Sequence, residues 1–229
     1  MSFVDWIYPK VCAGCEKEGE YICDECRGKL NPPVSICPEC NRPSIDGWVH
    51  ARCQRRYGID RLIVGLPYHG AVQKCLKNVK YKSSWEVINF LHEVWEQKAE
   101  FMIHDLRSMN INALVTAVPM WGMKERKRGF NQAERLGKLI ASEMGLPYLD
   151  VLERVRDTRA MWGLDHKQRI QNVVGAFSLN SQFSVLNFQK IKLVLLVDDV
   201  WTTGATMRMC AGVLIRGGAK KVWGIALSR

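Results

Sequence analysis

Cysteines are concentrated near the start of this 229-residue chain and limit how that part can fold. Seven of the nine lie between residues 12 and 53: six form Cys-x-x-Cys pairs, and the seventh ends a His-x-x-Cys unit. Two ligands three positions apart on a tight turn can reach one tetrahedral Zn²⁺ ion. The four units supply eight candidate ligands, enough for two closed sites: Cys12, Cys15, Cys23, Cys26, Cys37, Cys40, His50 and Cys53.

The order of these ligands suggests how they divide between two sites. The simplest pairing places Cys12, Cys15, Cys23 and Cys26 at one ion and Cys37, Cys40, His50 and Cys53 at the other, while an interleaved pairing stays open. Four protein ligands leave no position for a substrate, so both ions are expected to be structural. A small module with few large apolar residues is expected to need this metal to fold. Outside the module, Cys75 and Cys210 lie on apolar helix faces and are expected to be buried.

Charge and targeting signals narrow the function classes. The net charge is +10 with a pI near 9.2, which favours anionic partners such as phosphate ligands or nucleic acid. The start, MSFVDWIYPK, carries Asp5 within its apolar stretch and has no basic segment typical of a secretory signal. The sequence holds no apolar run near the roughly 20 residues that span a bilayer. A cytoplasmic protein without a membrane span is therefore expected, and disulfides are not.

The composition changes near Gly58, which predicts a zinc-ribbon module over residues 1–57 and a second domain over residues 58–229. In the second part, strand-like and helical patterns alternate. Strands are predicted at 61–68, 112–119, 175–180, 191–197 and 220–227, and helices at 71–81, 84–106, 131–145 and 206–218. This alternation predicts an α/β fold with a mostly parallel sheet and helices on both faces.

The stretch LVLLVDDVWTTGAT, residues 193–206, contains the strongest candidate for a ligand site. A buried parallel strand brings Asp198 and Asp199 to the ligand-binding edge of the sheet, where carboxylates can accept hydrogen bonds from ribose hydroxyls and help to hold Mg²⁺. The small residues that follow can direct backbone amides, hydroxyls and a helix N-terminus at a phosphate. These residues are Thr202, Thr203, Gly204, Ala205 and Thr206. The stretch predicts a site for a ribose 5-phosphate.

This stretch resembles the phosphoribosyl pyrophosphate (PRPP) signature of type I phosphoribosyltransferases. Residues 118–141, with Arg-Gly-Phe-Asn-Gln-Ala at 128–133, resemble the ComF family of competence-related proteins, whose double zinc ribbon the cysteine module also resembles. Residues 154–177 match that family at Arg154, Thr158, Gly163, Leu164, Arg169, Asn172 and Phe177. The resemblance covers nearly the whole chain. It departs at Met161, where glutamine is expected, and at His50, which replaces a cysteine.

The resemblance implies a type I phosphoribosyltransferase domain behind two zinc ribbons, binding PRPP with Mg²⁺. It implies transfer of the phosphoribosyl group to a nitrogenous acceptor, with Asp198 and Asp199 as the catalytic residues that hold the ribose hydroxyls. Residues 202–206 would bind the 5-phosphate. Pyrophosphate would lie beside Pro119, Arg126, Lys127 and Arg128, and a flexible loop that excludes water would carry Arg159 and Arg169.

A second hypothesis belongs to a different class. ComF-like proteins are associated with the uptake of transforming DNA, so the chain can be read as a non-catalytic factor that binds single-stranded DNA, works with other competence proteins and uses PRPP as a regulatory ligand. Its basic charge, its zinc ribbons and its eight tryptophans, which can stack on bases, are compatible with this hypothesis. Turnover of PRPP would favour the enzyme, and salt-dependent DNA retention without turnover would favour the binder.

Overall fold

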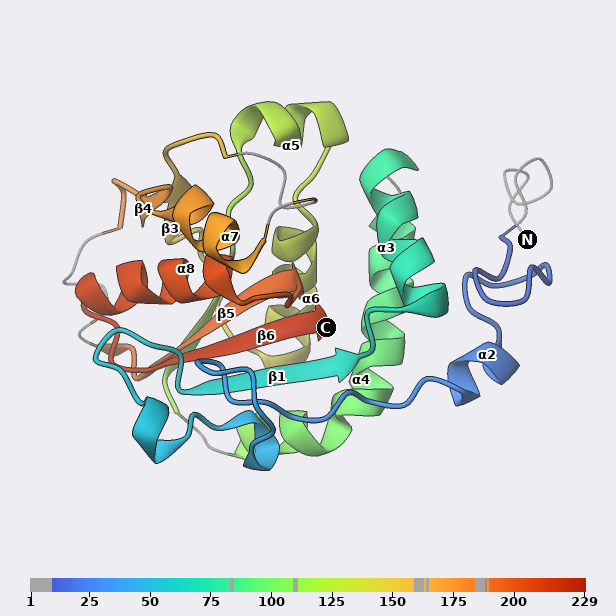
Figure 1. The fold of residues 1–229 in the computed structure, drawn as a ribbon, viewed down its shortest axis with the longest axis horizontal. Helices are drawn as coiled ribbons and strands as arrows, with labels where there is room; N and C mark the ends of the chain where they lie inside the picture. Colours follow the sequence, from blue (N-terminus) through green and yellow to red (C-terminus); the bar gives the residue numbers. More distant parts are fainter. Residues whose placement is uncertain are drawn as a thin grey trace.

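The computed structural model describes residues 10–82, 85–108, 111–158, 163, 165–183, 188 and 190–229 (Figure 1). Two small cysteine-containing ribbons come first, and an α/β unit follows. We call residues 10–28, which include helix α2 (Asp24–Gly28), the first ribbon. Residues 35–57, with the short 3-10 turns η1 (Ile45–Gly47) and η2 (Ala51–Cys53), form the second ribbon.

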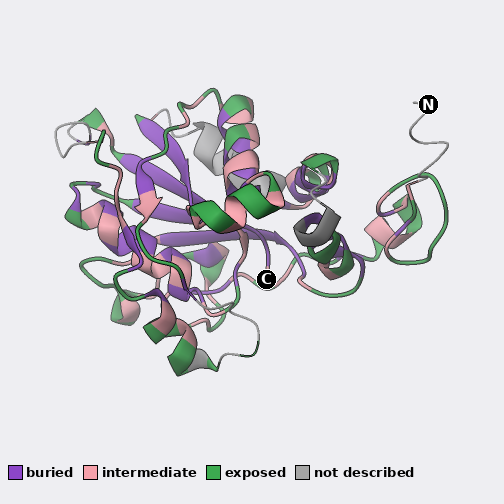
Figure 2. Cartoon of the chain, turned by 90° about the horizontal axis from the view of Figure 1, so that it is seen from above, coloured by how far each residue is buried: buried purple, intermediate pink, exposed green. Residues whose placement is uncertain are grey.

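Four parallel strands form the central sheet in the order β1-β6-β5-β2. Their bounds are Arg61–Leu66 for β1, Ala113–Ala117 for β2, Leu193–Val200 for β5 and Val222–Ser228 for β6. The residues of β1, β2 and β6 are all buried, as expected for strands covered on both faces (Figure 2). The predicted parallel α/β sheet is confirmed.

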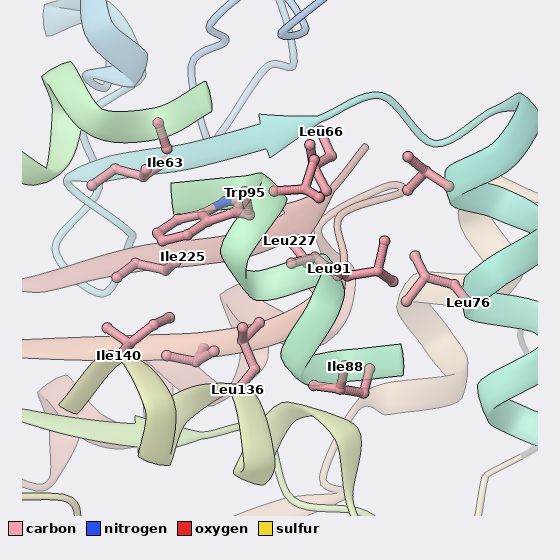
Figure 3. Close-up of a cluster of buried hydrophobic side chains, with 14 of the residues drawn as sticks. Ile63, Leu66, Leu76, Ile88, Leu91, Trp95, Leu136, Ile140, Ile225 and Leu227 are labelled. Carbon is pink, nitrogen blue, oxygen red and sulfur yellow. The ribbon is translucent and has the colours of Figure 1, made fainter. Parts of the chain in front are cut away.

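Helices cover both faces of the sheet, and side chains alternate between two hydrophobic clusters. On β5, Leu193, Leu195 and Val197 join the cluster under α4 (Trp85–Ser108) and α6 (Gln132–Met144). Their neighbours Val194 and Leu196 join the cluster under α8 (Ala205–Arg216). Figure 3 shows the first cluster, in which Trp95 and Leu91 of α4 lie against Ile225 and Leu227 of β6. Helix α3 (Gly70–Lys82) packs beside α4.

The structure departs from the predicted elements in four short segments, of which the unpredicted strand β3 (Leu152–Arg154) is one. The strand predicted at 175–180 is β4 (Phe177–Leu179), which pairs antiparallel with β3 outside the main sheet. Helices α5 (Gly122–Arg128) and α7 (His166–Val173) were not predicted. Both are short and mostly polar, so they carry no apolar periodicity to reveal them. None of the described helices has the length and apolarity that crossing a bilayer requires.

Both ribbons contact the α/β unit. The ring of Tyr21 in the first ribbon packs edge-on against Phe90 of α4, with 5.6 Å between centroids. In the second ribbon, Trp48 forms a β-bridge with Arg61 at the start of β1. The Arg61 side chain is buried, and its guanidinium lies 5.1 Å from the Trp48 ring and 5.0 Å from the Trp223 ring. These contacts join the ribbons, which precede residue 58, to the α/β unit that follows it. The domain boundary at residues 57 and 58 therefore stays a prediction.

Candidate functional site

The first four cysteines gather into one cluster. The sulfurs of Cys12, Cys15, Cys23 and Cys26 all lie within 4.8 Å of one another, and those of Cys15 and Cys23 are 3.6 Å apart. Four thiolates placed tetrahedrally at the usual zinc distance would be about 3.8 Å apart. The spacing therefore fits a Zn²⁺ ion, and the ligands group as neighbours in sequence rather than interleaved.

The second cluster contains Cys37, Cys40, His50 and Cys53, also within 4.8 Å. His50 Nδ1 lies 3.4 Å from the Cys40 sulfur and 3.9 Å from the Cys53 sulfur. Its other nitrogen, Nε2, lies 3.0 Å from the Pro43 carbonyl oxygen. With Nδ1 as the zinc ligand, Nε2 carries the ring proton and donates a hydrogen bond to this carbonyl. This hydrogen bond orients the ring. His50 therefore replaces a cysteine without loss of a ligand.

Both clusters are built on the same backbone turn. The N–H of the third ligand, Cys23 or His50, donates to the sulfur of the first, Cys12 or Cys37, at 3.3 and 3.5 Å. Burial opposes ionisation of Cys12, but backbone N–H groups outweigh it and lower the pKa of Cys12 to about 6. A thiol with that pKa is largely thiolate at neutral pH, the form that binds zinc.

The aspartate pair belongs to β5, which continues to Val200, beyond the predicted end at residue 197. Successive side chains of a strand point to opposite faces, so Asp198 lies on the α8 face and Asp199 on the other. Asp198 is close enough to the buried Cys210 that, after burial itself, its charge is the next cause of the raised pKa of that thiol. The Asp199 N–H donates to Asp198 Oδ1 at 2.8 Å. The two carboxylates thus lie on opposite faces of the sheet at the end of β5.

Residues 201–206 join β5 to α8 and include the first two residues of that helix. They contain the residues predicted to bind a 5-phosphate, and we call them the phosphate loop. Trp201 is buried, and Gly204 has a φ of 76°, in the left-handed region that favours glycine. The Thr203 hydroxyl accepts the Ala205 N–H at 3.4 Å, and Thr202 is exposed. Helix α8 begins at Ala205 and is 12 residues long, so its first free N–H groups open onto this loop.

A second polar segment follows β2. Pro119 is half-buried, and α5 begins three residues later, at Gly122. Arg126 and Lys127 of α5 are exposed. Arg128 is partly buried and donates to Gln132 Oε1 at 2.7 Å. These three side chains are the cations predicted to lie beside pyrophosphate.

Asn131 anchors the end of that segment. Its Nδ2 donates to the Val118 carbonyl at 3.0 Å, and its Oδ1 accepts the Ala133 N–H at 3.1 Å as the N-cap of α6. Asn131 belongs to the Arg-Gly-Phe-Asn-Gln-Ala motif at 128–133, but no role was predicted for it. A buried asparagine directly before an apolar helix is the signal that identifies such a cap.

The flexible loop expected to exclude water, which we call the lid, belongs to a segment that is partly described. Arg154 donates to the Thr158 hydroxyl and lies 5.3 Å from the Phe177 ring, so three motif residues meet. Lys124 of α5 donates to Asp157 Oδ1 at 2.7 Å and to the Thr158 carbonyl at 2.6 Å.

The rest of the expected lid divides between described and undescribed residues. Arg169 is half-buried on α7. Arg159, Met161 and Leu164 lie outside the described residues.

Several buried polar atoms near the carboxyl ends of the strands have no hydrogen-bond partner among the described residues. They include Trp121 Nε1 and Gln132 Nε2 after β2, and Ser228 Oγ at the end of β6. Buried donors are normally paired, so unpaired ones at this edge indicate a place where a ligand or water completes them. By contrast, a cavity of about 440 Å³ between the first ribbon and α4 is lined by Glu20, Glu86 and Glu93 and contains none of the candidate site residues.

Comparison with known proteins places these features in a family context. Residues 3–55 match the model of the double zinc ribbon domain. The chain is 28% identical to the DNA utilization protein YhgH of Salmonella typhimurium over 204 residues, 88% of this chain and 87% of that protein. It is 24% identical to competence protein F of Haemophilus influenzae, covering 94% and 90% of the two chains. It is 25% identical to competence protein ComFC of Bacillus subtilis, covering 88% and 81%. These matches confirm the predicted resemblance to the ComF family.

Proposed function

We propose that this relative of the competence proteins binds PRPP with Mg²⁺ at the carboxyl edge of its parallel sheet. It transfers the phosphoribosyl group to a nitrogenous acceptor and releases pyrophosphate, in a process connected with DNA uptake. The observation that carries the proposal is the phosphate loop: Gly204, in a left-handed conformation, opens helix α8 five residues after Asp199 in a buried parallel strand.

The loop and the strand end would divide the recognition of PRPP between them. The N–H groups at the start of α8 and the hydroxyls of Thr202, Thr203 and Thr206 would bind the 5-phosphate. The carboxylates of Asp198 and Asp199, which leave the strand end on opposite faces, would accept hydrogen bonds from the ribose hydroxyls, each from its own side. Bound Mg²⁺ would neutralise part of the charge on the pyrophosphate oxygens.

The chain's own residues would act mainly by positioning and charge. As the bond from the anomeric carbon to pyrophosphate breaks, positive charge develops on the sugar and negative charge on the leaving group. Arg126, Lys127 and Arg128 stand after β2, where they would stabilise the departing pyrophosphate. Lys124 of α5 donates hydrogen bonds to Asp157 and Thr158, which precede the expected lid. The lid would therefore close over the pyrophosphate position beside α5.

Calorimetry with PRPP and Mg²⁺ tests the proposal. The wild-type chain should bind, and a double variant Asp198→Asn and Asp199→Asn should lose binding, because amides are weaker acceptors and poor partners for Mg²⁺. The matched control is Asp24→Asn with Glu25→Gln, which removes two neighbouring carboxylates from exposed positions of α2. Equal PRPP affinity in both variants would assign the aspartate pair a structural role.

A second candidate function is binding of single-stranded DNA, with PRPP as a regulatory ligand. It is favoured by the relatives' names, DNA utilization protein and competence protein, and by three exposed arginines on the second ribbon: Arg52, Arg55 and Arg56. A pyrophosphate-release screen over nitrogenous acceptors separates the two functions. Release with any acceptor supports the enzyme, whereas PRPP binding without release, together with DNA retention, supports the binder.

A further inference from the structure

We propose that the second zinc knuckle, residues 37–41, is a positioning element of the phosphate loop, so that the affinity for a phosphorylated ligand depends on this knuckle and not on the equivalent turn of the first ribbon. The inference rests on the proposed role of the loop in binding PRPP. It adds residues from outside the α/β unit to the site.

Asn41 makes the first connection. Its Oδ1 accepts a hydrogen bond from Trp201 Nε1 at 3.0 Å, and its Nδ2 lies 3.4 Å from the Thr203 carbonyl oxygen, to which it donates. One side chain of the ribbon therefore holds both the ring below the loop and the backbone within it. About 160 residues of chain separate these partners.

Arg208 of α8 makes the second connection from the opposite direction. Its Nε donates to the Pro38 carbonyl at 2.6 Å, and its Nη1 donates to the Thr203 carbonyl at 2.8 Å. Its guanidinium also lies over the Trp201 ring, 5.3 Å from the centroid. The Thr203 carbonyl thus accepts from Asn41 and Arg208 together.

This shared carbonyl determines where the next amide points. Thr203 C=O and Gly204 N–H belong to one planar trans peptide group, in which the two bonds point in opposite directions. When Asn41 and Arg208 hold the carbonyl on the ribbon side, the Gly204 N–H is directed away from the ribbon. That is the orientation an amide needs to donate to a bound phosphate.

The metal cluster fixes the residues that make these contacts. Pro38 lies between the ligands Cys37 and Cys40, and Asn41 follows Cys40 directly. The Asn41 N–H donates to the Cys37 carbonyl at 3.0 Å, and Asn41 has a φ of 58°. This turn closes around the zinc position, so bound metal would hold Asn41 and Pro38 in place for the loop.

The first ribbon has the same turn in a different setting. Glu16 follows Cys15 as Asn41 follows Cys40, has a φ of 66°, and donates its N–H to the Cys12 carbonyl at 2.9 Å. Glu16 is exposed, and its ribbon docks on α4 through Tyr21 rather than on the phosphate loop. Glu16 therefore provides an internal control for Asn41.

The test compares Asn41→Gly with Glu16→Gly in the zinc-loaded full chain. Glycine is at ease at both positive φ values, so both variants keep the knuckle turn and should retain wild-type zinc content. Calorimetry with PRPP and Mg²⁺ should show a dissociation constant about tenfold larger for Asn41→Gly than for the wild type. This is the effect of losing one or two hydrogen bonds. Glu16→Gly should bind like the wild type.

A spectroscopic measurement reports the contact itself. In protein labelled with ¹⁵N-tryptophan, the indole N–H resonance of Trp201, assigned with Trp201→Phe, should move in Asn41→Gly and stay in place in Glu16→Gly. If Asn41→Gly lowers zinc content, Arg208→Lys tests the second connection, because an ammonium cannot reproduce the guanidinium bonds to both carbonyls.

The outcomes separate this inference from the function on which it rests. Weaker PRPP binding with a shifted Trp201 resonance in Asn41→Gly alone supports it. Wild-type affinity in Asn41→Gly and Arg208→Lys overturns it and leaves PRPP binding intact. An unchanged Trp201 resonance in Asn41→Gly also overturns it. Failure of the wild-type chain to bind PRPP overturns the proposed function and this inference together.

Discussion

The ring of Trp201 fills the space that a side chain on Gly204 would need. A Cβ added to Gly204 would come within 2.2 Å of the ring, and the residue also has a φ of 76°. The loop can therefore take its shape only with glycine here, and the buried indole acts as a template beneath it.

Gly204→Ala should lower the free energy of unfolding by about 3 kcal/mol, the sum of left-handed backbone strain and a steric clash. Gly145→Ala is the control, because Gly145 has a φ of 63° but nothing within 4 Å of its Cβ position. It should cost only about 1 kcal/mol. Urea unfolding curves measure both values. Equal losses would mean that the Trp201 ring yields easily and does not shape the loop.

Purified protein should contain two zinc ions per chain, one for each cluster of four ligands. His50→Ala should retain about one after dialysis against a mild chelator, because three remaining ligands hold the second ion weakly. His69→Ala, at an exposed histidine outside the clusters, should keep two. Elemental analysis decides this. Two ions retained by His50→Ala would remove His50 from the ligand set.

The contact between Lys124 and Asp157 should respond to acid. The hydrogen bond from Lys124 lowers the pKa of Asp157 below its ordinary 3.8, so the contact stabilises the segment above that pH and is lost as the pH falls through the lowered pKa. In Lys124→Ala, the pKa of Asp157 should return towards its ordinary value.

NMR titration of the Asp157 carboxyl carbon measures this shift. Lys127→Ala, which removes an exposed lysine from the same helix, should leave the pKa of Asp157 low. Because both partners are about half exposed, we expect little change in global stability. An Asp157 pKa that is the same in wild type and Lys124→Ala would show that the contact does not form in solution.

Binding to single-stranded DNA should depend on salt through the second ribbon. In the double variant Arg52→Ala and Arg56→Ala, the slope of log affinity against log salt should be less negative by about 1 to 1.5, if both side chains contact phosphates. Arg55 is better left unchanged, because it pairs with Glu39 at 3.2 Å inside the knuckle that contacts the phosphate loop.

Lys190→Ala with Lys220→Ala removes the same charge from exposed positions outside the ribbons and serves as the control. Fluorescence anisotropy with a labelled oligonucleotide measures both slopes. Absence of binding by the wild type at about 50 mM salt, where phosphate contacts count most, would exclude direct DNA binding by the isolated protein.

Local patterns predicted the elements that are long and apolar. The run from Leu193 to Val197 identified the inner strand β5, and the helix predicted at 131–145 is α6, which ends at Met144. The spacing of cysteines and His50 predicted both metal clusters, since ligands three apart need only a local turn. Helix α5 escaped prediction because its seven residues are mostly charged.

Contacts between distant segments could not be predicted in the same way. Nothing near Asn41 in the sequence indicates that it bonds to Trp201, and nothing near Lys124 indicates Asp157. The placement of Asp198 and Asp199 on opposite faces of the sheet was not predicted either, because it depends on β5 extending past Val197 to Val200. Each of these features follows from tertiary packing, which short-range periodicity does not encode.

The bridge between Trp48 and Arg61 has a consequence for solubility. Strand β1 lies at one end of the described sheet, where β6 is its neighbouring strand, and all six of its residues are buried. The second ribbon covers its free side at Arg61, where Trp48 forms the bridge and the Val49 N–H donates to the Asp60 carbonyl at 2.9 Å. An uncovered apolar edge strand is a template for pairing with another chain. Chelation of zinc should therefore cause edge-to-edge aggregation, visible by light scattering before the helices unfold.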